Sequence, residues 1–177
     1  MNSLLRFSVL AFVSWAIAIP YEEYILAPKS RTLHPLSVHS SNGSVSNPES
    51  LSASPGSAVF EGDSATAYDF AINIAGVVTL EIGLVSNAEQ YIGVTFSESS
   101  LWVSNGSSDA TADAGKDETL WFHVPGPGRY TAPREKERGG FRYMTLVHNT
   151  TGSVEVTSAE VHYTPMVRSL TMIATVC

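Results

Sequence analysis

The sequence predicts an all-β protein with the architecture of an antiparallel β-sandwich of jelly-roll type. Apolar and polar residues alternate in several short runs, and turn-forming residues separate these runs. No apolar pattern with a helical period of ten or more residues occurs after the first 18 residues. Because a sheet with one apolar face needs a second layer to cover it, eight to ten such strands indicate a sandwich.

The clearest runs predict a β meander over residues 68–96, with turns at Ala75-Gly76 and at residues 86–90. Side chains on one face of its three strands are apolar: Tyr68, Phe70, Ile72 and Ile74; Val78, Leu80, Ile82 and Leu84; Ile92, Val94 and Phe96. Six of them are expected in the core: Phe70, Ile72, Leu80, Ile82, Val94 and Phe96. Thr79 falls on the opposite face, which we expect to be solvated.

The segments around the meander are less regular. Pro28 and Pro35 restrict any strand near them to a sheet edge, and residues 36–39 predict such a strand. Residues 41–57 are rich in Ser, Asn, Gly and Pro and predict a long surface loop. The remaining expected elements are a short apolar run at 101–103, a strand at 120–124, a strand inside a sheet at 141–147, a hairpin turn at 149–152 and one or two strands at 154–163.

The two ends of the chain differ from the middle. Arg6, the apolar run 7–17 and the small residues Ala16 and Ala18 predict a signal peptide over residues 1–18. That run is too short to cross a bilayer, so no membrane anchor is expected and the protein is predicted to be secreted. A single β-sandwich domain is expected over residues 19–166. The tail, 167–177, has no interpretable pattern.

Charge and cysteine content limit the possible partners. Cleavage after Ala18 would remove one of 10 basic and none of 17 acidic side chains, which leaves a net charge of −8 and argues against nucleic acid. The only cysteine is Cys177, so no intrachain disulfide can form. No pattern indicates a cofactor.

The candidate catalytic groups are a pair of carboxyl groups and a Ser-His-Asp triad. A glycosidase needs two carboxyl groups about 5 to 9.5 Å apart across the scissile bond. The available acids are Asp69, Glu81, Asp109, Asp113, Asp117, Glu118, Glu155 and Glu160. Exposed strand and loop positions are the simpler interpretation of these acids. A Ser-His-Asp triad could use His123, His148 or His162, but the Gly-x-Ser-x-Gly elbow is absent, and His123 is expected to be partly buried.

Acidic, basic and aromatic side chains are the candidate binding groups. Asp109, Asp113, Asp117 and Glu118 could hold Ca²⁺, although a solvated acidic loop is favoured because the EF-hand spacing is absent. A basic group is expected to pair with these acids: Arg129, Arg134, Lys136, Arg138 and Arg142. Four aromatic residues could stack on a sugar or fill the core: Trp102, Trp121, Tyr130 and Tyr143. Trp102, flanked by polar loop residues, is the best candidate for sugar contact.

Three stretches carry a family resemblance. DFAINIAGVV (residues 69–78) and GGFRYMTL (139–146) resemble strands of the β-sandwich that opens secreted α-L-rhamnosidases, and YILAPKSRTLHP (24–35) is similar to the start of fungal members. The resemblance covers residues 21–165. Ala71 stands where the family usually carries Gly, so the tight strand bend at this position is expected to be altered.

The resemblance implies a galactose-binding-like sandwich that belongs to a glycoside hydrolase acting on rhamnosylated glycosides. In that family the catalytic acids lie on a C-terminal (α/α)₆ barrel, which nothing in this chain matches. No catalytic residue can therefore be carried over. The expected role is a non-catalytic accessory domain or truncated product whose partner is a catalytic barrel, and an independent carbohydrate-binding module is the alternative.

Processing of the chain can be tested directly. We expect the secreted protein to begin at Ile19 and to carry N-glycans at one or more of three sequons, at Asn42, Asn105 and Asn149. Intact-mass measurement before and after enzymatic deglycosylation should show both changes. Recovery of an uncleaved, unglycosylated protein inside the cell would contradict this prediction.

Overall fold

A computed structural model describes residues 28, 30–52, 56–108 and 117–164 of the chain. Its strands are β1 (Thr32–Leu33), β2 (Ser37–Ser46), β3 (Ala58–Val85), β4 (Tyr91–Ser97), β5 (Leu120–His123), β6 (Gly128–Thr131), β7 (Arg138–His148) and β8 (Ser153–Tyr163). Short 3₁₀ helices lie at η2 (Pro48–Ser52), η3 (Ser100–Trp102) and η4 (Arg134–Lys136). All strand pairs are antiparallel, in the order β1-β8-β3-β7-β4-β5, with β2 and β6 also paired to β3.

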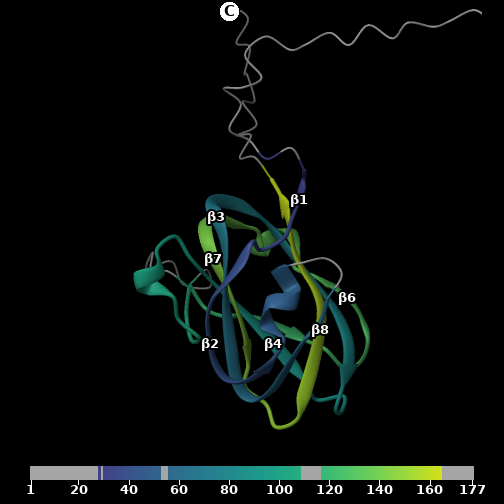
Figure 1. Cartoon of the computed structure of the whole chain (residues 1–177). Helices are drawn as coiled ribbons and strands as arrows, with labels where there is room; N and C mark the ends of the chain where they lie inside the picture. The colour runs from purple at the N-terminus through teal and green to yellow at the C-terminus, as the bar shows by residue number, and fades with distance from the viewer. Residues whose placement is uncertain (1–27, 29, 53–55, 109–116, 165–177) are drawn as a thin grey trace, which may run out of the picture.

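The strands curl around a common apolar interior (Figure 1). This arrangement confirms the predicted all-β antiparallel sandwich. Phe60, Tyr68, Leu80, Phe141 and Leu146 are among its most deeply buried side chains. The strands predicted at 120–124, at 141–147 and within 154–163 correspond to β5, β7 and β8, and β7 does lie inside the sheet, between β3 and β4.

Strand β3 differs most from the prediction, because it runs unbroken through the first two strands of the expected meander. Ala75-Gly76 is not a turn. The ladder is irregular between Asp69 and Gly76, and Ala71 adopts a left-handed φ of 63°. A bulge of this kind bends a strand and changes its partners without ending it. Gly76 is needed for another reason: a Cβ there would collide with the carbonyl oxygen of His162 on β8.

The bend also explains the one error among the six predicted core residues. Phe70, Leu80, Ile82, Val94 and Phe96 are buried as expected. Ile72 is 49% exposed, because it follows the bulge at Ala71, where strict alternation of faces is lost.

Thr79 was expected in solvent but is only 4% exposed. Strand β6 pairs with β3 beside Thr79, so this part of β3 lies inside the sheet between β6 and β8, and the Thr79 hydroxyl lies 2.9 Å from that of Thr131. The prediction was wrong because it did not include β6, a strand that begins at the last glycine of Pro-Gly-Pro-Gly.

Two connections were also misassigned. The expected loop 41–57 is part of β2 as far as Ser46, and η2 follows, with Leu51 buried. The Ser- and Asn-rich composition wrongly predicted a loop here. β2 can carry these polar residues because it is an exposed edge strand that pairs only with β3. Residues 149–152 are not a hairpin turn: they join β7 to β8, which pair with β3 at different positions rather than with each other.

Two leucines of β3 test the burial of this strand. Leu80 is fully buried and Leu84 is 76% exposed. We expect Leu80→Ala to lower the free energy of unfolding by about 2 to 5 kcal/mol, through lost apolar transfer and a residual cavity. Leu84→Ala, the matched control, should change it by less than about 0.5 kcal/mol. Chemical denaturation followed by circular dichroism measures both, and equal losses would show that the assigned burial is wrong.

Candidate functional site

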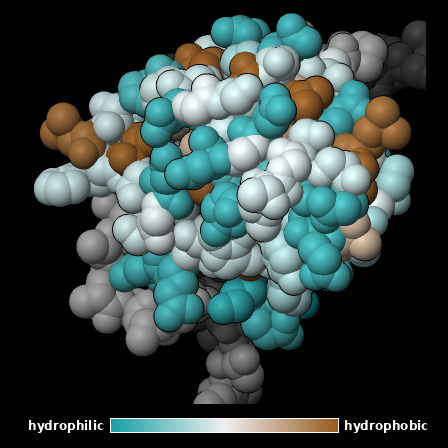
Figure 2. Space-filling model, turned by 90° about the horizontal axis from the view of Figure 1, so that it is seen from below, coloured by the Kyte–Doolittle hydropathy of each residue, from teal (hydrophilic) through white to brown (hydrophobic). Residues whose placement is uncertain are grey.

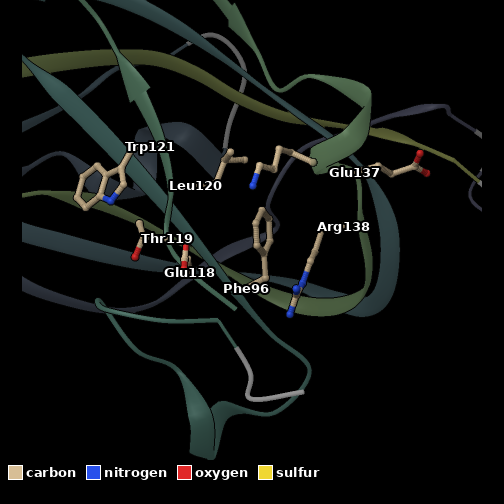
Figure 3. A pocket seen from close by; sticks show the side chains of 8 residues that line it. Phe96, Glu118, Thr119, Leu120, Trp121, Glu137 and Arg138 are labelled. Carbon is tan, nitrogen blue, oxygen red and sulfur yellow. The ribbon is translucent and has the colours of Figure 1, made fainter. Parts of the chain in front are cut away.

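A groove of about 280 Å³ lies beside β5, the last strand in the sheet order. Its lining combines apolar and charged side chains: Phe96, Leu120, Trp121, Thr119, Glu118, Lys136, Glu137 and Arg138. Figure 3 shows Phe96 near the middle of this group, with Arg138 beside it and with Trp121 and Glu137 at opposite ends. The volume is close to the lower end of the roughly 300–1,000 Å³ typical of small-molecule sites.

The floor of the groove is held in place by the core. The ring of Phe96 packs against Phe141 with centroids 4.8 Å apart. The guanidinium of Arg138 lies 5.9 Å from the Phe96 centroid, and its Nη2 is 3.7 Å from a carboxylate oxygen of Asp117. Cation–π attraction and the ion pair both fix Arg138 over the ring. The groove is therefore largely formed before any ligand enters.

The charges that line the groove are balanced. Glu118 and Glu137 are acidic, whereas Lys136 and Arg138 are basic. The Glu137 carboxylate accepts a hydrogen bond from the hydroxyl of Thr164. Such a lining offers both acceptors and donors without a net charge, which suits a neutral ligand rich in hydroxyl groups, because a hydroxyl can donate and accept at once.

Trp121 forms the aromatic wall. It lies opposite Gly93 of β4, and a Cβ on Gly93 would be only 2.7 Å from the indole ring. The indole therefore rests directly on the backbone of β4, and Trp121 stays 41% exposed. From the sequence, Trp121 could equally have filled the core. The structure gives that place to its neighbour Phe122 instead.

The other aromatic candidates lie elsewhere. Trp102 is 66% exposed on η3 and does not line the groove. Tyr130 packs against the core, and Tyr143 is buried, with His39 and Arg142 against its ring. His123 is exposed rather than partly buried: it stands on the solvent side of β5, with its Nε2 2.9 Å from the carbonyl oxygen of Ala88.

The acids on the strands are mostly engaged in ion pairs. Arg129 binds both Glu81 and Glu160, and Arg142 makes two hydrogen bonds of 2.8 Å to Asp69. The predicted pairing of the basic group with the acidic loop was thus wrong for Arg129 and Arg142, which bind strand acids instead. Arg138 does contact Asp117 of that loop.

The other candidate acids include Glu155, Asp109 and Asp113. A carboxylate oxygen of Glu155 accepts a hydrogen bond from the backbone N–H of Leu84. Asp109 and Asp113 lie outside the described residues. Within the part of the chain that the structure describes, no three His, Cys, Asp or Glu side chains are placed to hold a metal.

His148 lies in a buried polar cluster rather than in a triad. Its Nδ1 is 2.6 Å from the carbonyl oxygen of Gly62, and its Nε2 is 2.8 Å from Gln90 Oε1 and 2.9 Å from the Thr150 hydroxyl. Burial lowers the pKa of His148 below its ordinary value. His162, the third candidate, is exposed on β8. The His148 cluster has a structural role, because it ties the C-terminal end of β7 to Gly62 of β3 and to Gln90, the residue that precedes β4.

The remaining surface features are the glycosylation sequons and the distribution of hydrophobic residues. The three sequon asparagines are exposed: Asn42, Asn105 and Asn149. On the face shown in Figure 2, hydrophobic residues stand apart among hydrophilic ones. Among the described residues, no helix is long and apolar enough to cross a membrane.

Comparison with known proteins bears on the fold. No protein-family model matches the sequence, and no curated protein matches it significantly. A rhamnosidase from Klebsiella oxytoca, solved with rhamnose bound, is similar over 75% of this chain, with a TM-score of 0.51 and 16% identity. This chain corresponds to only 28% of the length of that protein.

Two smaller structures are also similar. CBM32-1 from a family 31 glycoside hydrolase of Clostridium perfringens shares 12% identity, with a TM-score of 0.47, over 80% of this chain and 99% of its own. A fucose-binding module from Streptococcus pneumoniae shares 13% identity, with a TM-score of 0.45, over 75% of this chain and 96% of its own. At such identities the likeness concerns the fold alone.

The Asp69–Arg142 pair makes stability depend on pH. Hydrogen bonds from Arg142 lower the pKa of Asp69, so the stability that it contributes is present above its unfolded pKa, about 3.9, and is lost as the pH falls through its folded pKa. We expect Asp69→Asn to lower the free energy of unfolding at pH 7 by about 1 to 3 kcal/mol. The difference from the wild type should shrink below about pH 3.9.

Urea denaturation at a series of pH values measures this dependence. Glu61→Gln, on an exposed position of the same strand, is the control and should behave as the wild type within about 0.5 kcal/mol. A loss for Asp69→Asn that stays constant down to pH 2 would show that the carboxylate charge is not responsible.

Proposed function

We propose that this chain is a non-catalytic carbohydrate-binding β-sandwich of a secreted protein, and that the groove beside β5 is its sugar site. The observation that carries the proposal is the indole of Trp121, held against the backbone at Gly93 and partly exposed at the end of the groove. An aromatic face of this kind offers an apolar surface to the C–H face of a pyranose ring.

The charged residues of the groove would then select for hydroxyl groups. Glu118 can accept a hydrogen bond from a sugar hydroxyl, and Lys136 and Arg138 can donate to one. Glu118 and Lys136 are exposed to water and contribute little, so binding in the millimolar to micromolar range is expected, about 4 to 8 kcal/mol. Affinity of that size suits an accessory module, which raises local concentration rather than holding a ligand permanently.

The attached activity is proposed from the family resemblance. The stretches at residues 24–35, 69–78 and 139–146 are similar to the sandwich of secreted α-L-rhamnosidases, and the fold is similar to part of a rhamnosidase. In this proposal the sandwich supports an (α/α)₆ barrel that hydrolyses rhamnosylated glycosides. Because residues of this chain alone line the groove, a self-contained module is the form of the proposal that we favour.

Trp102 offers a second candidate surface. It stands on η3 beside Leu101, and both side chains are exposed. The two side chains form a small exposed apolar patch, which lacks the convergent hydrogen-bond donors and acceptors of the groove. Trp102 is therefore the rival candidate for sugar contact, and the experiment below distinguishes it from the groove.

Binding is tested by calorimetric titration of the purified protein with rhamnose and with rhamnosylated oligosaccharides. We expect weak saturable binding that Trp121→Ala reduces at least tenfold, about 1.4 kcal/mol, because the stacking surface is lost. Trp102→Ala, which removes an equally large exposed aromatic side chain, is the matched control and should bind as the wild type. The reverse result would move the sugar site from the groove to η3.

Hydrolysis is tested on the same preparations with an aryl α-L-rhamnoside. No turnover is expected from this polypeptide alone. Turnover that is abolished by a single Asp or Glu substitution would overturn the non-catalytic assignment. Fusion to a rhamnosidase barrel that lacks its own sandwich should restore activity to that barrel if the accessory role is correct.

A further inference from the structure

We infer that the sugar site continues beyond the groove as a row of aromatic side chains on the outer face of β4 and β5, and that its ligand is a neutral glycan chain rather than a single sugar. The row consists of Tyr91, Trp121 and His123. The inference rests on the proposed function and assigns it a class of ligand.

Strand register places these residues on one face. Tyr91 lies opposite His123, and Gly93 lies opposite Trp121, in the antiparallel ladder of β4 and β5. The residues between them, Ile92 and Phe122, are buried on the inner face. Side chains two residues apart on a strand are separated by roughly 6–7 Å, so Trp121 and His123 are adjacent along the surface. Trp121 also lines the groove, which makes the row continuous with it.

The rings of the row are positioned by the protein itself. The rings of Tyr91 and His123 lie 4.9 Å apart at 30° to one another, and His123 Nε2 is 2.9 Å from the carbonyl oxygen of Ala88. Gly93 has no side chain, and its place in the row is covered by the indole of Trp121. Rings that are already ordered lose little entropy when a ligand binds, which favours weak, extended contacts.

The chemistry of the surface favours a neutral chain. Tyr91 and Trp121 carry no charge, and the four charged residues of the groove balance in sign. The protein as a whole has a formal net charge of −7, which disfavours an anionic polysaccharide. Successive sugar rings of a neutral glycan could instead occupy the groove and then the faces of the row.

The inference predicts that affinity depends on chain length. An array of neutral glycans, each presented as a mono-, di- and tetrasaccharide, should first identify the series that is bound, and calorimetry then gives its dissociation constants. We expect the wild type to bind the tetrasaccharide about tenfold more tightly than the monosaccharide. His123→Ala and Tyr91→Ala should remove this gain and leave monosaccharide binding unchanged.

Controls separate this inference from the proposed function. His162→Ala removes an exposed histidine of β8 and should keep the full gain with length. Thermal unfolding of every variant verifies the fold, and His123→Gln provides a second, polar substitution if the alanine variant is unstable. Equal affinity for all lengths, or a gain that survives both row variants, would overturn the inference alone. Absence of binding to every glycan would overturn the proposed function with it.

Discussion

The fold depends on the backbone pairing of β3. Buried N–H and C=O groups require hydrogen-bond partners, and β3 finds them on β2, β6, β7 and β8 in turn. It can do so only because it bends between Asp69 and Gly76. Ala71 takes a left-handed conformation there, at a cost of roughly 1 to 2 kcal/mol for a residue with a Cβ. The Asp69 carboxylate accepts the backbone N–H of Ala71 at 2.6 Å and so supports the bend.

Local pattern was enough to predict much of this sandwich. Alternation identified β4, β7 and β8, and it placed Leu80, Ile82, Val94 and Phe96 in the core. It could do so because a strand with one buried face has apolar and polar residues in strict alternation. It failed where the outcome depends on distant residues. Thr79 is buried by a strand about fifty residues later in the chain, and residues 41–46 form a strand only because β3 offers them an edge.

The candidate site was harder to predict for the same reason. Trp121 and Phe122 are adjacent aromatic residues, and their order alone does not say which faces the core. One signal was available: Gly93, within a strand pattern, indicates close approach of another group. That group is the indole of Trp121. The two residues are far apart in the sequence, so their contact could not be predicted from it. The groove also joins residues from β4, β5, η4 and β7, so no contiguous motif could describe it.

The position of β8 has a consequence for how the chain folds. β8 is the last described strand, yet it pairs with β1 and with both ends of β3. During synthesis from the N-terminus, the edges of these earlier strands stay without their partner until β8 has emerged. Such non-local pairing makes folding slow and leaves apolar strand edges open to aggregation for that time. Folding of this sandwich is therefore completed only after nearly the whole described chain has been translated, and a nascent chain that stops before Ser153 lacks the strand that pairs with β1 and with both ends of β3.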